Sequence, residues 1–232
     1  REAFSAWLEA YNSGIGTNSG NAHNLAAIAP EIANYGYADI LIKHLQDAQK
    51  KLFDEQVANG EKPTGIWQRD YNYRAVWGTY KYLHILNLDS YNTAIDLKYA
   101  PYMIESCLEV VKLPPNKDYA YNDLMNQWSA INGVIDNVKK HYGEDEANKL
   151  YDMVRRDPVF LINNSIEKLR PFKVEDGSFC VRVNGTSPAN IYGVHIAVGD
   201  LHEGTVNSTH IICCMYAAKR RAPSASVVLA AL

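Results

Sequence analysis

Three groups of residues in this sequence could carry out acid–base chemistry or line a polar ligand site. Removing a proton from the carbon beside a carboxylate requires a cation or amide that neutralises the carboxylate, and a Tyr or His that moves the proton. In the first group, Arg69 or Arg74 with Tyr71 or Tyr73 could supply both parts. The alternative is a helix start in which Asp70 is the N-cap and the tyrosines pack. The full first group is Trp67, Arg69, Asp70, Tyr71, Tyr73 and Arg74.

The second group surrounds a predicted junction between a loop and a helix. His202 titrates near neutrality and is the better proton carrier, whereas Glu203 near a helix N-terminus would be stabilised as an anion. The spacing from His202 to His210 is not that of an HExxH motif, and no CxxC pair occurs, so we expect no metal site. The alternative is a helix cap with exposed histidines. The group is His195, Asp200, His202, Glu203, Asn207 and His210.

The third group mixes amides with aromatic side chains, which suits a sugar subsite. The alternative is a polar inner face of a helix with Trp128 in the core. A pair of carboxylates for glycoside hydrolysis could come from Asp70, Asp123 or Glu203. The group is Tyr119, Tyr121, Asn122, Asn126, Gln127 and Trp128.

Composition limits the possible partners. The chain has 232 residues, of which 47% are hydrophobic, so it can bury a sizeable core. A net charge of -3 gives no electrostatic case for nucleic acid or an anionic membrane surface, and no apolar run approaches the ~20 residues of a membrane span. The glycine-rich loop at residues 14–20 has neither a preceding strand nor a following GK[ST], so we expect a surface loop and no cofactor.

Apolar periodicity predicts an all-α protein. A charged helix precedes a more apolar one in three successive hairpins, with a spacing of about 50 residues. The first and third hairpins share a glycine, a spacer and a large aromatic residue in their loops, at Gly65 to Trp67 and Gly177 to Phe179. A glycine turn followed by an aromatic wedge would explain this pattern. Helices are predicted at residues 3–11, 22–34, 37–59, 71–86, 94–113, 121–141, 144–155, 157–169 and 205–218.

Two short motifs resemble those of the α/α-toroid superfamily. They are Asp176-Gly177-Ser178-Phe179 and Glu203-Gly204-Thr205-Val206-Asn207. The superfamily includes terpenoid cyclases, prenyltransferase β subunits, and toroidal polysaccharide lyases and glycoside hydrolases, and a DGSF or DGSW turn between an outer and an inner helix is typical of it. The resemblance covers residues 37–218. Since neither an Asp-rich cyclase motif nor a prenyltransferase zinc-ligand set is found, the resemblance favours the carbohydrate-active members.

The resemblance implies repeated helical hairpins that form an α/α toroid or an incomplete toroid, with a small β-like excursion at residues 178–183. It predicts an N-terminal helical or linker segment at 1–36, a toroid-like domain at 37–221 and a tail at 222–232. The expected partner is a polysaccharide or oligosaccharide, and an enzyme of this kind would be secreted or periplasmic.

The resemblance also implies a site near the ends of the inner helices. The polysaccharide lyase-like hypothesis has two alternatives, a glycoside hydrolase-like enzyme and a non-catalytic module that binds a glycan or a protein. A cyclase-like enzyme is a more distant alternative. The candidate catalytic residues are Tyr73, Arg74, His202 and Glu203. The candidate substrate contacts are Trp67, Arg69, Tyr71, Tyr121, Asn126, Trp128, His195 and Asn207.

Overall fold

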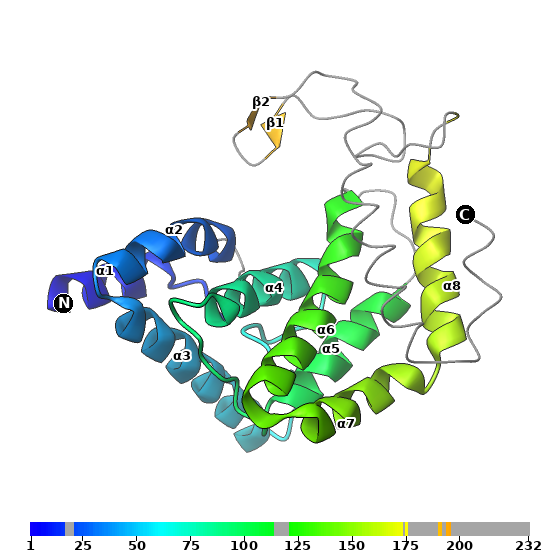
Figure 1. Cartoon of the computed structure of the whole chain (residues 1–232), viewed down its shortest axis with the longest axis horizontal. Coiled ribbons are helices and arrows are strands. Elements are labelled where there is room, and N and C mark those ends of the chain that lie inside the picture. Colours follow the sequence, from blue (N-terminus) through cyan, green and yellow to red (C-terminus); the bar gives the residue numbers. More distant parts are fainter. Residues whose placement is uncertain (17–20, 114–120, 174, 176–189, 192–193, 196–232) are drawn as a thin grey trace. The chain divides into compact units, whose positions relative to one another are not determined.

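The computed structural model is helical, and it describes residues 1–16, 21–113, 121–173, 175, 190–191 and 194–195 (Figure 1). The all-α class is confirmed for this part of the chain. A two-residue strand β1 (Asn190–Ile191) pairs with β2 (Val194–His195) in antiparallel fashion. The predicted excursion at 178–183, the predicted helix at 205–218 and the tail lie outside the described residues. The helices are α1 (Glu2–Tyr11), α2 (Ala22–Asn34), α3 (Ala38–Ala58), α4 (Tyr73–Asn87), α5 (Ala100–Lys112), α6 (Tyr121–Tyr142), α7 (Glu144–Arg155) and α8 (Pro158–Leu169).

Two of the sequence signals for helix ends, at Gly60 and Pro158, work as expected in the structure. Gly60 follows α3 with a φ of 70°, a conformation that glycine adopts without a steric penalty. Asp157 caps α8, where its side chain accepts a hydrogen bond from the Phe160 N–H, and Pro158 takes the first position. Pro30 lies inside α2 without ending it. Local sequence therefore fixes the helix ends at Gly60 and Pro158.

Helix α5 is the exception, because it begins at Ala100 rather than at residue 94. Asn137 of α6 accepts a hydrogen bond from the Ile95 N–H at 2.9 Å and donates one to the Thr93 carbonyl at 2.9 Å. The hydroxyl of Tyr142 donates to the Ile95 carbonyl at 2.8 Å. These long-range bonds satisfy the backbone of this segment in a non-helical conformation, and they override its helical periodicity.

The chain forms two compact units. The first unit contains residues 1–110 and 130–153, and the second contains 111–129 and 154–232. Helices α5 and α6 each contribute to both units. The first 36 residues belong to the first unit.

The N-terminal helices are held in the first unit by both apolar and polar contacts. Helix α2 packs against α4 through a row of small and aliphatic side chains, and α1 packs along α3. Leu25 and Ala29 of α2 are completely buried. The Tyr91 hydroxyl donates to the Ala29 carbonyl at 2.8 Å, and the Tyr82 hydroxyl donates to Oδ1 of Asn12 at 2.9 Å. Burial of both apolar and hydrogen-bonded groups makes these helices part of the core.

The loop between α3 and α4 turns at Gly65. Its φ is 69°, and a Cβ there would lie 2.7 Å from Cβ of Tyr102 and 2.9 Å from the Tyr99 carbonyl oxygen. The Gly65 carbonyl accepts a hydrogen bond from Nε2 of the buried Gln49 at 2.7 Å. The turn therefore requires glycine both for its backbone conformation and for space. Two residues later the buried Trp67 forms the predicted aromatic wedge.

In the described part of the second unit, hydrogen bonds link α8 to α6 and to the end of α5. The Trp128 indole donates to Oγ of Ser165 at 3.0 Å. Lys168 and Asn164 both donate to the Val111 carbonyl near the C-terminus of α5. Burial lowers the pKa of Lys168 to about 8.

Candidate functional site

The loop before α4 carries three predicted substrate contacts, and they have very different surroundings. Trp67 is 1% exposed, its Nε1 donates to the Leu45 carbonyl at 2.8 Å, and its ring centroid lies 5.3 Å from that of Tyr82. The indole therefore packs in the core and presents no face to a sugar, which is the packing alternative for this residue. Tyr71 is 47% exposed. Arg69 lies between them in sequence and has carboxylate partners.

Two carboxylates hold the Arg69 guanidinium. Its Nη2 lies 2.9 Å from Oε2 of Glu55, and its Nη1 lies 3.2 Å from Oε2 of Glu61. The Arg69 carbonyl accepts a hydrogen bond from Nε2 of Gln56 at 3.0 Å. Because these glutamates already balance its charge, Arg69 is less suited than Arg74 to neutralise the carboxylate of a substrate.

The start of α4 separates Tyr73 from Arg74. Asn72, and not Asp70, is the N-cap, and its side-chain oxygen accepts a hydrogen bond from the Ala75 N–H at 2.9 Å. Tyr73 is 3% exposed, whereas Arg74 is exposed. Successive helical residues project about 100° apart, so the two side chains do not share a face. Of the combinations of arginine and tyrosine that the sequence leaves open, Tyr73 with Arg74 is therefore one whose side chains point in different directions.

The other predicted residues fall in the second unit or outside the described residues. Asn126 and Trp128 are 1% and 2% exposed, so both lie in the core of that unit, as in the packing alternative. Tyr121 begins α6, and the structure describes its backbone alone. The same holds for His195, which pairs with Asn190 across the two strands. The rest of the second group lies outside the described residues, namely Asp200, His202, Glu203, Asn207 and His210.

Helix α4 brings together a set of cationic and aromatic side chains, of which Arg74 alone is predicted from the sequence. Arg74, Trp77, Lys81 and His84 are spaced by three, four and three residues, so they share one face of the helix. His23 of α2 stacks on this face, with its ring centroid 5.9 Å from that of Trp77. We call these five residues the α4 basic face. Helix α4 contains no Asp or Glu.

The α4 basic face concentrates positive charge in a partly buried place. Burial, and then the charge of Lys81, lowers the pKa of both His23 and His84. Burial also lowers the pKa of Lys81 itself, whose Nζ lies 4.8 Å from the ring centroid of Tyr80. Neither Arg74 nor Lys81 has a carboxylate partner in the described part of the chain. A bound anion would therefore offset the positive charges of Arg74 and Lys81.

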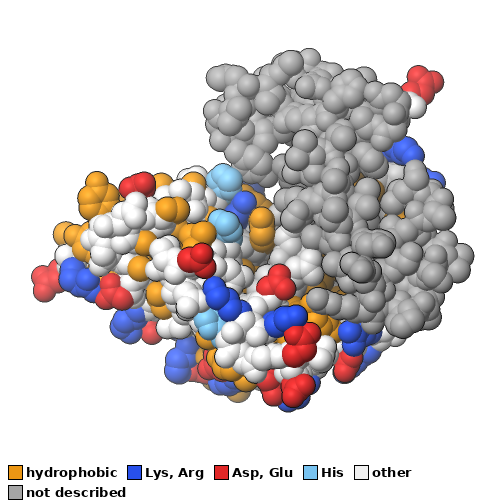
Figure 2. Space-filling view, viewed as in Figure 1, with side chains coloured by type: hydrophobic (Ala, Val, Ile, Leu, Met, Phe, Trp, Pro, Cys, Tyr) orange, Lys and Arg blue, Asp and Glu red, His pale blue; other side chains and the backbone are white. Residues whose placement is uncertain are grey.

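The space-filling view shows side chains of these kinds side by side (Figure 2). In Figure 2, histidine side chains and a Lys or Arg side chain lie next to one another, with hydrophobic side chains around them. This combination of cations with apolar and aromatic surface suits a ligand that has both anionic groups and apolar ring faces.

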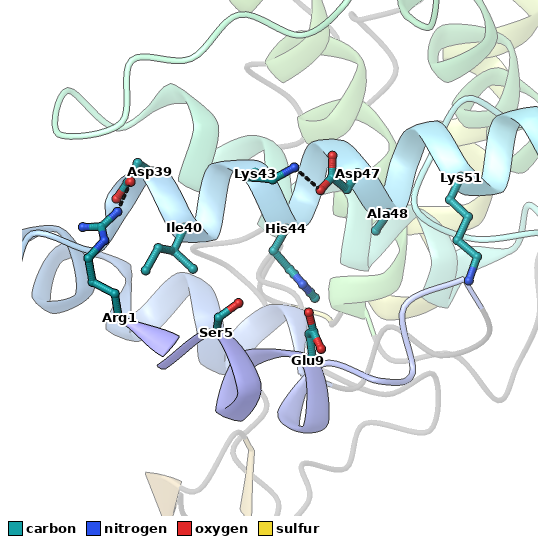
Figure 3. Close-up of a pocket in the computed structure, with 10 residues that line it drawn as sticks. All are labelled: Arg1, Ser5, Glu9, Asp39, Ile40, Lys43, His44, Asp47, Ala48 and Lys51. Atoms are coloured by element: carbon teal, nitrogen blue, oxygen red, sulfur yellow. Dashed lines mark hydrogen bonds and ion pairs between the residues drawn. The ribbon is translucent and has the colours of Figure 1, made fainter. Parts of the chain in front are cut away.

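A pocket of about 530 Å³ lies elsewhere in the first unit, between α1 and α3 (Figure 3). It has both acidic and basic side chains, together with Ser5 and His44. Burial lowers the pKa of His44, although the nearby carboxylates of Glu9 and Asp47 act in the opposite direction. The pocket is therefore polar, but unlike the α4 basic face its charges are of both signs.

Comparison with protein-family models, with curated proteins and with solved structures finds no match to this chain. In the part that the structure describes, no helix is long and apolar enough to cross a membrane. Within the same residues, no three or more His, Cys, Asp or Glu side chains are grouped as they would be to hold a metal ion.

The signal for the α4 basic face is present in the sequence. The spacing of Arg74, Lys81 and His84 at i, i+7 and i+10 marks one helical face, and the absence of acidic residues from 73–87 can be read directly. The position of His23 on this face depends on the packing of α2 against α4, which periodicity alone does not reveal.

Proposed function

We propose that this chain is a helical-hairpin protein that binds an acidic polysaccharide along the α4 basic face. The observation that carries the proposal is the row of cationic and aromatic side chains on a helix that has no carboxylate. A uronate-containing glycan offers the complementary groups, because each acidic sugar has a carboxylate and an apolar ring face.

The geometry of the row suits a chain of sugars better than a single sugar. Arg74 and His84 are ten residues apart, which corresponds to about 15 Å along the helix axis. Lys81 lies between them, and Trp77 supplies an aromatic ring beside the cations. A ligand that spans the row can place several carboxylates near cations and a sugar ring near an aromatic side chain.

We also propose that the fold is an α/α toroid, and a ligand site on α4 is consistent with such a fold. Helix α3 carries a row of exposed charged residues, and α4 is mostly apolar with a basic face, as expected for an outer and an inner helix of one hairpin. In the α/α-toroid superfamily the site lies near the inner helices. The proposal extends that placement to the α4 basic face.

A nucleic acid is a less suitable ligand. Polyphosphate chains are bound through many Lys and Arg contacts, and the chain as a whole has a net charge of -3. Two of the cation-forming groups on the face are histidines with lowered pKa values, so they are mostly neutral near pH 7. The face therefore favours a ligand of moderate charge density.

Lyase activity is the second candidate function, and one observation favours it. His23 and His84 lie near the cation Lys81, and burial followed by that charge lowers the pKa of both, which favours the neutral imidazole. A neutral imidazole can accept the proton beside a carboxylate that a cation neutralises, which is the first step of β-elimination from a uronate. Arg74 and Lys81 would neutralise the carboxylate in this reaction.

The binding proposal is tested by calorimetric titration with oligogalacturonate, a neutral dextran oligomer and a single-stranded DNA oligomer. We expect oligogalacturonate to bind, and the variants Arg74→Gln and Lys81→Met each to weaken binding about 5- to 10-fold. Arg156→Gln removes the same charge from an exposed residue that is not part of the α4 basic face, and it serves as the matched control. Equal binding of dextran, preferential binding of DNA, or no binding of oligogalacturonate would each contradict the proposal.

The lyase candidate is tested on the same samples. A rise in ultraviolet absorbance from unsaturated products, lost in His84→Gln or His23→Gln, would establish elimination. New reducing ends without absorbance would indicate hydrolysis and direct attention to a carboxylate pair. Binding without either product would leave a non-catalytic glycan-binding protein.

A further inference from the structure

The pocket between α1 and α3 has the size of a site for a small ligand. Its volume of about 530 Å³ lies within the range of roughly 300–1,000 Å³ that is typical of ligand sites. The α3 side chains that line it repeat every three or four residues, and they face Ser5 and Glu9 of α1 (Figure 3). It does not include any residue of the α4 basic face.

The charges of the pocket are balanced, and two ion pairs account for most of them. Lys43 lies 2.6 Å from Asp47, and Arg1 pairs with Asp39. Of the six charged residues that line the pocket, Glu9 and Lys51 remain without an ion pair among the described residues. A ligand that complements this pocket therefore carries one positive and one negative group.

His44 lies in the middle of the pocket, and a buried network sets its tautomer. Oδ1 of the buried Asn12 accepts a hydrogen bond from the Tyr82 hydroxyl at 2.9 Å. The amide Nδ2 of Asn12 therefore donates to Nε2 of His44, 3.2 Å away, and the imidazole is neutral with its proton on Nδ1. In Figure 3 the His44 ring points toward α1 and Glu9. Its Nδ1–H is a donor for a ligand, because no described side chain accepts from it.

The separation of these groups indicates the length of the ligand. His44, beside Glu9, and Lys51 are seven residues apart on α3, which corresponds to about 10.5 Å along the helix. An extended chain spans about 3.3–3.6 Å per residue, so the two ends of a tripeptide are separated by a comparable distance. Ile40 and Ala48 give the pocket an apolar wall between its charged ends.

We propose that this pocket binds a short peptide with free ends, its ammonium group beside Glu9 and its carboxylate beside Lys51. The Nδ1–H of His44 donates to a carbonyl oxygen of the peptide. The proposal does not depend on glycan binding at the α4 basic face, because the two sites share no residue.

The test is a titration of the intact chain with triglycine, followed by calorimetry and by the NMR shifts of His44. Two blocked forms, N-acetyl-triglycine and triglycine amide, remove one charge each. We expect triglycine to bind in the millimolar range or tighter, and each blocked form to bind about tenfold more weakly because it loses one ion pair.

Two variants assign the ends of the peptide. Glu9→Gln should weaken triglycine about tenfold yet leave the affinity for N-acetyl-triglycine unchanged, because that ligand has no ammonium group. Lys51→Met should weaken triglycine and spare triglycine amide. Lys50→Met and Glu2→Gln change neighbouring charges outside the pocket, and they are the matched controls. Circular dichroism and thermal melts check that each variant is folded.

Three outcomes would overturn the proposal: no binding of triglycine, equal binding of the blocked forms, or a loss of affinity in Glu9→Gln that is the same for free and acetylated peptide. Each would show that the unpaired charges of Glu9 and Lys51 do not recognise peptide ends. A failure here would leave oligogalacturonate binding unaffected, so the two proposals can be separated.

Discussion

The α4 basic face and the α1/α3 pocket are two polar surfaces of the same compact unit, and they arrange charge in opposite ways. On the basic face, cation-forming groups lie together on a helix without carboxylates. In the pocket, cations and carboxylates are equal in number and mostly paired. Burial lowers the histidine pKa in both places, but Lys81 adds to the effect on the face, whereas Glu9 and Asp47 oppose it in the pocket. The histidines of the two surfaces therefore lie in electrostatic fields of opposite sign.

This difference predicts different ligands. Uncompensated positive charge favours a polyanion, and its binding is expected to weaken as salt rises. A neutral pocket with one carboxylate and one ammonium group that lack partners favours a small zwitterion. A substitution in the structure that supports both surfaces should affect both ligands. A substitution in one surface should affect the binding of its own ligand alone.

The largest effect is expected from Gly65→Ala, because the loop between α3 and α4 supports both surfaces. The new Cβ would lie 2.7 Å from Cβ of Tyr102 at a φ of 69°, so the change combines backbone strain with overpacking. We expect a loss of about 2–4 kcal/mol in the free energy of unfolding, measured by urea denaturation. Gly143→Ala also has a positive φ, of 95°, but open space, so it should cost less.

The next effect is expected from Asn12→Ala, which removes the amide between Tyr82 and His44. It leaves the buried Tyr82 hydroxyl without its acceptor, and a loss of about 1–3 kcal/mol in the free energy of unfolding follows. The tautomer of His44 should also change, as measured by the 15N shifts of its ring. Glycan binding at the α4 basic face should be unaffected, and a parallel loss there would contradict the separation of the two surfaces.

The double variant Arg74→Gln with Lys81→Met should weaken oligogalacturonate more than either single change. If both cations contact carboxylates of one ligand, the combined loss is at least about 25-fold, and the slope of affinity against salt becomes shallower. Binding of triglycine in the pocket should not change. An unaltered salt dependence would show that these side chains do not contact the charged groups of the glycan.

The stability of the protein should fall as the pH falls through about 6.5. His23, His44 and His84 all have pKa values lowered on folding, so the unfolded chain binds protons at a pH where the folded chain does not. This contribution is fully present above the unfolded pKa of about 6.5, and it is lost as the pH falls toward the folded values. Denaturation at pH 7.5 and 5.5 measures the effect. His44→Gln should reduce it, whereas a rise in stability on acidification would contradict it.

The sequence predicts those features that depend on local spacing. Helix ends at Gly60 and Pro158 follow from backbone preferences, and the glycine and aromatic turn at Gly65 and Trp67 follows from a short motif. The start of α5 does not follow from local spacing. The side chains of Asn137 and Tyr142 form hydrogen bonds with the backbone of the preceding segment, from more than forty residues away. Long-range hydrogen bonds of this kind leave no periodic signal in the segment that they hold.

The candidate sites show the same limit. An aromatic side chain beside polar residues suggests a sugar platform at Trp67 and Trp128, but the spacing of residues does not separate a platform from a core, and the structure buries both indoles. The pocket requires His44 of α3 beside Glu9 of α1, a pairing that depends on helix packing. Helical periodicity within α3 does not reveal which residues of α1 lie beside the His44 ring.

The most direct test of the difference between the two surfaces is an NMR titration of the histidines with and without oligogalacturonate. An anion on the α4 basic face should raise the pKa of His23 and His84, because it opposes the positive field of Lys81, and it should leave the pKa of His44 unchanged. Unchanged pKa values for His23 and His84 in the presence of bound glycan, or an equal rise at all three histidines, would contradict glycan binding at this face.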